Sequence, residues 1–137
     1  MKRIEEKISE IGQFLEELSA IAPATIGDYK SDLMRRAACE RYVEKIVEAV
    51  TDVAFLTIKA KKFRIPEDDA DAFTILLENK VINDALAKKL RHAKGMKNII
   101  AHQYGRIDDE IVFAAINEEL DKDVREFIRV VSEAVEK

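Results

Sequence analysis

The segment from residue 29 to about residue 62 contains neither glycine nor proline, so nothing in it interrupts a helix. One face is apolar at steps of three and four, and consists of Val43, Ile46, Val47, Val50, Val53, Ala54 and Thr57. A second face is bordered by Cys39, Tyr42 and Ala49. At 1.5 Å per residue this helix would be roughly 50 Å long. We expect so wide an apolar surface to be covered from more than one side, by a partner chain as well.

The rest of the chain also favours helices. Only four glycines and two prolines occur in 137 residues, which is too few for the turns of a β-rich fold. Apolar periodicity predicts further helices at 2–21, 69–79, 83–102 and from 108 onward. Breaks or caps are expected at Pro23, Asp28, Pro66 and Gly105. We predict an all-α fold, an up-and-down bundle of about five helices with a long second helix, forming a single domain over residues 1–137.

Composition and motifs indicate the cellular compartment of the protein and whether it binds a metal or cofactor. Cys39 is the single cysteine, so the chain has no internal disulfide and suits a reducing compartment. The first residues are charged throughout, and no apolar run approaches the length of a membrane span, so we expect a cytoplasmic protein without membrane contact. Neither His92 nor His102 follows a glutamate by three residues, and no phosphate-binding loop or Cys/His cluster occurs. We therefore expect no metal and no cofactor.

The charge of the chain is unevenly distributed. The net charge is −4, which argues against nonspecific binding to nucleic acid. Residues 80–106 nevertheless carry seven basic residues and one acid, whereas residues 108–137 carry ten acids and four bases. A basic face beside an acidic one could steer a polyanion or dock two copies of the chain. Two ordinary solvated helix surfaces would give the same pattern.

Polar residues gather at the end of the fourth predicted helix, in the stretch KNIIAHQYG at 97–105. Two of them, Asn98 and His102, share a helix face with the earlier basic residues Arg91 and Lys94. Lys97 lies elsewhere around the helix, but its long stem could reach the same cavity. His102 and Tyr104 could share a site only if the helix ends near His102 and the chain turns, which Gly105 allows.

These residue types suit the cleavage of RNA. A histidine can move protons at neutral pH, a nearby cation can stabilise charge on a phosphate, and a tyrosine or asparagine can orient the phosphate. The 2′-hydroxyl of RNA supplies an internal nucleophile, so this chemistry needs no metal. The alternative is structural, because histidine is favoured at helix C-termini by the helix dipole, and Tyr104 could be a packing residue.

The order basic–Asn–x–x–x–His–x–Tyr, late in a five-helix chain, resembles the HEPN superfamily, most closely the HepT-like toxins. The segment RRAACERYVEKIVEAVTDVAFLTIKAKKFRIP is similar to the long second helix of that group, and MKNIIAHQYGRIDDEIVFAAI to its motif region. The resemblance implies an all-α homodimer with both motifs facing a shared cleft and metal-independent ribonuclease activity. It also implies a minimal nucleotidyltransferase antitoxin as partner, which in some relatives adds AMP to the tyrosine that matches Tyr104.

The resemblance assigns polar support to Asn98, catalysis to His102, and support or modification to Tyr104. The chain departs from the family at Lys97, where the motif has arginine, because lysine lacks the planar fork that grips a phosphate. One hypothesis is therefore a HepT-like endoribonuclease toxin with Lys97 as phosphate-binding cation. In it, further contacts to the RNA substrate come from Arg91, Lys94 and Arg106. A second hypothesis is a helical binding partner of a nucleotidyltransferase with little or no nuclease activity, and a third is a purely structural helical dimer.

Overall fold

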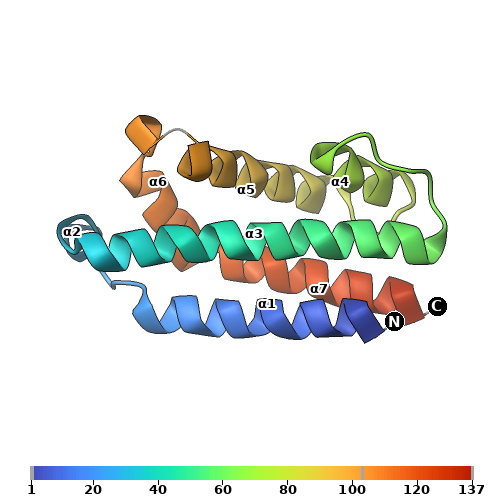
Figure 1. Ribbon diagram of the computed structural model, residues 1–137, viewed down its shortest axis with the longest axis horizontal. Coiled ribbons are helices and arrows are strands. Elements are labelled where there is room, and N and C mark those ends of the chain that lie inside the picture. Colours follow the sequence, from blue (N-terminus) through green and yellow to red (C-terminus); the bar gives the residue numbers. More distant parts are fainter. Residues whose placement is uncertain (1, 103, 137) are drawn as a thin grey trace.

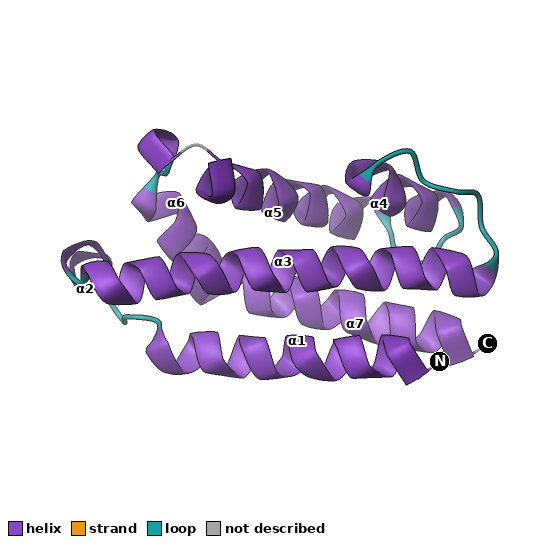
Figure 2. Cartoon of the chain, viewed as in Figure 1, coloured by secondary structure: helices purple, strands orange, loops and turns teal. Residues whose placement is uncertain are grey.

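The computed structural model describes residues 2–102 and 104–136, and for Lys2 and Tyr104 only the backbone. Every regular element in these ranges is helical, which confirms the all-α prediction (Figures 1 and 2). The helices are α1 (Lys2–Ile21), α2 (Ile26–Ser31), α3 (Leu33–Lys61), α4 (Asp69–Glu78), α5 (Asp84–His102), α6 (Asp109–Ala114) and α7 (Leu120–Glu136). A 3-10 turn, η1 (Tyr104–Arg106), precedes α6, and a π-helical segment, η2 (Ala115–Glu119), follows it. Within the described ranges no helix is long and apolar enough to cross a bilayer.

The long helix α3 forms the centre of an up-and-down bundle. It contacts α1, α4, α5 and α7, and Figure 1 shows α1 and α5 running antiparallel to it on opposite sides. The expected apolar face of α3 is buried, as are Cys39 and Ala49 on its second face. The chain itself covers this face, so the burial of α3 does not require a partner chain, and a partner chain on this helix stays a prediction. The large apolar residues of α3 that stay exposed are Leu33 and Met34, at its first turn.

The long helix begins later than predicted, because the chain breaks before it. Thr25, not Asp28, caps the short helix α2, and its hydroxyl accepts a hydrogen bond from the Asp28 backbone N–H at 3.1 Å. Asp32 has extended backbone angles and its carboxylate caps α3 by accepting from the Arg35 N–H at 3.0 Å. Two capping residues so close together favour two helix starts over one continuous helix. Arg35 also donates to the carbonyl of Ile21 at 2.9 Å, which ties α3 to the end of α1.

The last predicted helix is also divided. In the π-helical segment the Leu120 N–H donates to the Ala115 carbonyl, five residues earlier. The Asn117 side chain meanwhile donates to the Phe113 carbonyl at 3.0 Å. Such a wide turn shifts the helix register and bends its path, and α6 accordingly runs at an angle to α7 in Figure 1. Helix α6 contacts α2, and Figure 1 shows α6 and the C-terminal end of α5 at the same end of the bundle as α2.

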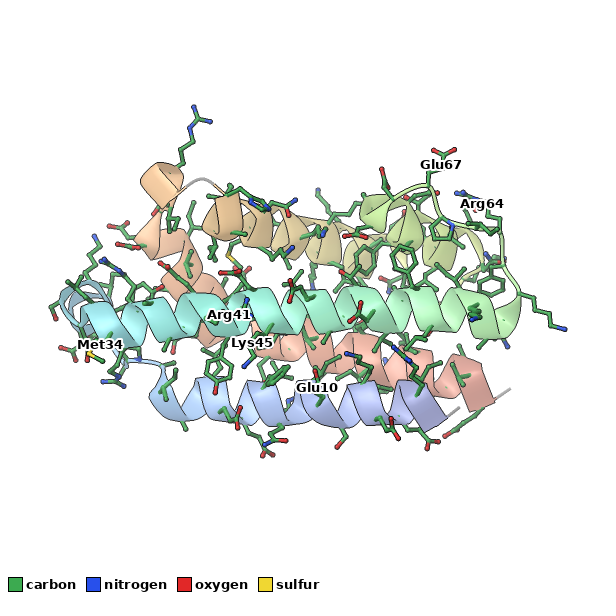
Figure 3. The ribbon with its side chains drawn as sticks, viewed as in Figure 1. Glu10, Met34, Arg41, Lys45, Arg64 and Glu67 are labelled. Atoms are coloured by element: carbon green, nitrogen blue, oxygen red, sulfur yellow. The ribbon has the colours of Figure 1, made fainter. Side chains whose placement is uncertain are left out.

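The opposite end is held by an ion-pair network. Arg64, in the loop between α3 and α4, donates to both carboxylate oxygens of Asp71 at 2.8 and 2.9 Å and to Glu78 at 3.0 Å. Figure 3 shows Arg64 and its neighbour Glu67 on this loop, far from α2. The guanidinium holds the pKa of the Asp71 carboxyl below its usual value. The network fixes the entry into α4, which in turn packs against α5.

The start of α6 is joined to α3 through a half-buried charge cluster. Arg36 forms an ion pair with Asp109 at 3.3 Å, and Glu40 lies one turn further along α3. Burial, and then the negative charge of Asp109, raise the pKa of the Glu40 carboxyl, although Arg36 opposes this shift. The Tyr29 hydroxyl is buried nearby without a hydrogen-bond partner in the described part of the chain, and burial raises its pKa too. The cluster therefore ties α6 to α3, although removing these charges from water costs free energy.

We expect Glu40→Gln to stabilise the protein near pH 7 and to leave its stability unchanged near pH 4. A raised folded-state pKa means that the stability contributed by protonated Glu40 is complete below its ordinary pKa and is lost as the pH rises through the folded pKa. Urea unfolding of both proteins at the two pH values measures the difference. Glu133→Gln, at an exposed position of α7, is the control. An equal effect of Glu40→Gln at both pH values would contradict the assignment.

Candidate functional site

Helix α5 carries the candidate site and is positioned by its cap and its buried stripe. The Asn83 side chain accepts a hydrogen bond from the Leu86 N–H at 2.8 Å, which starts the helix where the sequence predicts. Apolar residues at helical spacing form the buried stripe, which consists of Ile82, Leu86, Leu90 and Ile100. Ala93 and Met96 continue this stripe but are only half-buried, and both line grooves at the surface.

An exposed ridge runs along α5 and ends at His102. Arg91, Asn98 and His102 are all exposed and share this ridge, as helical spacing predicts. The helix ends at His102 and η1 begins two residues later, which meets the condition for His102 and Tyr104 to share a site. Gly105 lies inside η1 and has no positive φ, so α5 does not end with the left-handed glycine turn expected from the sequence. The Tyr104 side chain lies outside the described residues, and its pairing with His102 stays a prediction.

Two of the three predicted RNA-binding cations also hold α5 against α4. Lys94 forms an ion pair with Asp69 at 2.7 Å, and its side chain is only 16% exposed. Arg91 donates to the Thr74 hydroxyl at 2.6 Å. The structure therefore turns Lys94 away from the ridge, whereas Arg91 stays exposed on it. The basic face expected from composition is in part neutralised within the chain.

Lys97 faces α3 and not the ridge. It lines a polar groove of about 350 Å³ between α3 and α5. The groove is completed by Glu48, Thr51, Asp52, Phe55, Asp69 and Lys94. Two of these acids form ion pairs: Asp52 with Lys7 at 3.5 Å, and Asp69 with Lys94. The third acid, Glu48, has no ion pair among the described residues. The motif cation thus shares its groove with three carboxylates, two of which are already in ion pairs. The sequence alone does not reveal this, because the acids come from distant segments.

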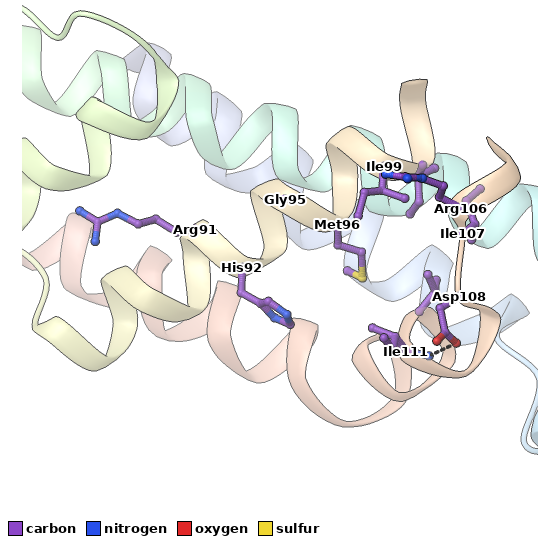
Figure 4. Close-up of a pocket in the computed structure, with 11 residues that line it drawn as sticks. Arg91, His92, Gly95, Met96, Ile99, Arg106, Ile107, Asp108 and Ile111 are labelled. Carbon is purple, nitrogen blue, oxygen red and sulfur yellow. Dashed lines mark hydrogen bonds between the residues drawn. The ribbon is translucent and has the colours of Figure 1, made fainter. Parts of the chain in front are cut away.

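A second groove lies on the other side of the ridge, between α5 and the η1–α6 segment (Figure 4). It measures about 380 Å³ and is largely apolar. It is lined by Arg91, His92, Gly95, Met96, Ile99, Ile100, Arg106, Ile107, Asp108, Ile111 and Val112. The sequence does not predict this groove. Its one signal is Ile99, an apolar residue that lies off the buried stripe and one turn before His102. The predicted RNA-binding residue Arg106 is exposed at the rim of the groove.

The described residues contain no group of three or more His, Cys, Asp and Glu side chains arranged to hold a metal ion. The functional groups at the site are the exposed imidazole of His102, the amide of Asn98 and the cations of the two flanks. These groups can transfer a proton and stabilise a charged phosphate.

Comparison with known proteins places the chain in a family. The sequence model of the family described as Ribonuclease HepT-like matches residues 4–131. The chain is 27% identical over 114 residues to the tRNA nuclease HepT of Aphanizomenon flos-aquae. This match covers 83% of this chain and 78% of the relative. It is 27% identical over 103 residues to the mRNA nuclease HepT of Shewanella oneidensis, and this match covers 75% of this chain and 77% of the relative.

A solved structure agrees with these sequence relatives. The tri-AMPylated HEPN toxin of Shewanella oneidensis, determined in complex with its MNT antitoxin, superposes on this chain with a TM-score of 0.88 and 25% identity. The match covers 95% of this chain and 96% of the toxin. The long α3, the helix that ends in the Asn–x–x–x–His–x–Tyr motif and the family match converge on one conclusion: the chain belongs to the HepT-like ribonuclease family of the HEPN superfamily.

Proposed function

We propose that this protein is a metal-independent endoribonuclease, the toxin of a toxin–antitoxin pair whose antitoxin is a minimal nucleotidyltransferase. The observation that carries the proposal is the exposed His102 at the C-terminal end of α5, where the family motif expects the catalytic histidine. Asn98 lies one turn before it on the same ridge. Relatives named as tRNA and mRNA nucleases support RNA as the substrate class.

The proposed reaction uses the RNA itself as nucleophile. The 2′-hydroxyl loses its proton to a base and attacks the adjacent phosphorus, while the bond from phosphorus to the 5′-oxygen breaks and that oxygen takes up a proton. The products are a 2′,3′-cyclic phosphate and a 5′-hydroxyl end. His102 moves the proton, Lys97 balances charge on the phosphate, and Asn98 and Tyr104 position it. Arg91 and Arg106 are exposed and attract the rest of the polyanion, whereas Lys94 is held by Asp69 and contributes less than the sequence predicts.

Two protons move in this reaction, and each chain offers one histidine at the motif. A homodimer with the two motifs facing each other would supply a second imidazole. Exposed apolar side chains at the motif end of the bundle support such an arrangement: Leu33 and Met34, in the first turn of α3. Figure 3 labels Met34 at this end. Sedimentation equilibrium tests the dimer, and a monomer at micromolar concentration would reject it.

The proposed antitoxin acts on Tyr104. In this step the phenol oxygen attacks the α-phosphate of ATP, the phenol proton leaves and pyrophosphate is released, so the tyrosine gains AMP. The AMPylated toxin of Shewanella oneidensis in its complex with an MNT antitoxin supports this partner. Mass spectrometry after coexpression with the nucleotidyltransferase tests the step, and an unmodified Tyr104 in a stable complex would reject it.

A second candidate function is a nucleotidyltransferase partner with weak nuclease activity. The surroundings of Lys97 favour it, because carboxylates from α3 and α4 line the groove that this cation occupies. They lower the positive potential where the phosphate must bind. The two candidates differ in the rate of RNA cleavage and not in the fold or the partner.

We expect the wild-type protein to cleave RNA in the presence of EDTA, and His102→Ala to lower the rate by about 10²–10⁴-fold, the usual contribution of a positioned acid or base. The measurement is single-turnover cleavage of end-labelled RNA resolved by electrophoresis. Arg129→Ala, at an exposed position of α7, is the control and should cleave at the wild-type rate. Equal rates for wild type and His102→Ala would end the nuclease proposal.

We expect Lys97→Arg to raise the cleavage rate about tenfold or more, because the guanidinium adds a second charge-assisted hydrogen bond to the phosphate. Lys122→Arg, at an exposed position of α7, makes the same chemical change away from the site and should have no effect. A large rise identifies the natural protein as an attenuated nuclease. A fall in rate after Lys97→Arg would show that this position prefers the compact ammonium.

A further inference from the structure

We infer that the apolar groove between α5 and the η1–α6 segment binds a nucleobase of the RNA, next to the phosphodiester that is cleaved. The inference rests on the proposed nuclease function and adds to it a site that selects among bases. The volume of about 380 Å³ lies within the range of small-molecule sites. The groove lies on the face of α5 turned toward α6, beside the ridge that carries His102.

The lining of the groove suits a flat heteroaromatic ring. Figure 4 shows the Met96 side chain pointing into the space between α5 and α6, with Ile111 on the opposite wall and Ile99 above. Ile99 is 38% exposed and Ile111 is 53% exposed, so both apolar side chains face solvent across a concave surface. Apolar side chains on two sides of a slot are a common way to hold an unstacked base. Among the described residues no Phe, Tyr or Trp side chain lines the slot, so the methionine and isoleucine side chains, together with the His92 imidazole, supply the contact.

The charge at the rim distinguishes a nucleotide from an apolar peptide. Figure 4 shows the Arg106 side chain extending toward Ile99 at one edge of the groove. The acid of the lining, Asp108, is already engaged, because its carboxylate accepts the backbone N–H groups of Glu110 at 3.0 Å and Ile111 at 3.3 Å. Arg91 points away from Met96, toward Thr74, so Arg106 is the rim cation nearest the apolar slot. An apolar floor with a guanidinium at its edge fits a base attached to a phosphate.

The position of the groove couples it to the proposed chemistry. Ile99 and His102 are three residues apart on α5 and are therefore neighbours on the helix surface. Arg106 closes η1, which directly follows the motif. A base held between Met96 and Ile111 would leave its own phosphate beside the exposed imidazole. Selection of the base would then decide which phosphodiester is cleaved.

Gly95 keeps the floor of the groove open. It lies inside α5, where glycine is unfavourable for the helix, and a Cβ built on it meets no atom within 4 Å. A larger side chain at this position would therefore enter the groove without disturbing the chain. Gly12 in the middle of α1 has an equally open Cβ position and lies on a different helix. These two glycines provide a matched pair of substitutions.

The test begins with wild-type protein and five probes: the 5′-monophosphates of adenosine, cytidine, guanosine and uridine, and ribose 5-phosphate, which lacks a base. We expect at least one nucleotide to bind about tenfold or more tightly than ribose 5-phosphate. Its addition should shift the NMR methyl resonances of Ile99 and Ile111, and leave that of Ile65, an 88% exposed residue between α3 and α4, in place. Gly95→Leu should remove the base-dependent gain, whereas Gly12→Leu should keep it. Both substitutions should raise the melting temperature, so loss of binding by Gly95→Leu is not loss of fold.

RNA supplies the second arm, because a free nucleotide could also come from the antitoxin reaction. We expect wild-type cleavage sites, mapped by sequencing, to share a preferred base that Gly95→Leu loses. Equal affinity for the nucleotides and ribose 5-phosphate, or an unchanged base preference in Gly95→Leu, would overturn the inference even if RNA is cleaved. A dimer that dissociates on Gly95→Leu while nucleotide affinity stays the same would also overturn it, since the groove would then hold a second copy. Nucleotide binding in the groove together with no RNA cleavage would reject the proposed function and leave a nucleotide site.

Discussion

The burial of α3 inside its own chain is the interaction on which the rest of the structure depends. Eleven of its residues are buried, and helices α1, α4, α5 and α7 surround it. Each buried aliphatic side chain contributes about 1.5–3 kcal/mol relative to exposure, so this contact is a large source of stability. It also decides geometry, because α5 must present its stripe of large apolar residues to α3 and to the core. The packing of this stripe therefore fixes which side chains lie on the remaining faces of α5, including those of the candidate site.

Those faces divide the candidate site into three strips. The ridge with Asn98 and His102 is exposed, the side with Lys97 turns toward the acids of α3, and the side with Ile99 turns toward α6. The imidazole of His102 therefore lies between a polar groove and an apolar one. In the nuclease that we propose, this arrangement would separate the recognition of the charged RNA backbone from the recognition of a base.

Much of this could be predicted from the sequence, and the failures have physical reasons. The first helix and the end of α5 lie where apolar periodicity and the polar motif placed them, because these signals are local. The break at Asp32 was missed because two capping side chains compete over a few residues, and a periodic pattern does not register that competition. The π-helical segment near Asn117 keeps the apolar spacing almost intact, so periodicity predicts one continuous helix where the structure has α6, η2 and α7. The pairing of Lys94 with Asp69 joins segments 25 residues apart, and spacing along one helix does not reveal it.

The nature of the RNA ends produced by cleavage tests the central claim most directly, because attack by the 2′-hydroxyl with proton transfer at His102 fixes the products. The measurement is mass spectrometry of the products formed in EDTA from an oligonucleotide with a ribose at the cleaved position, and from its 2′-deoxy counterpart. We expect 2′,3′-cyclic phosphate and 5′-hydroxyl ends from the first and no cleavage of the second. Products with 5′-phosphate ends, or cleavage of the 2′-deoxy oligonucleotide, would contradict it.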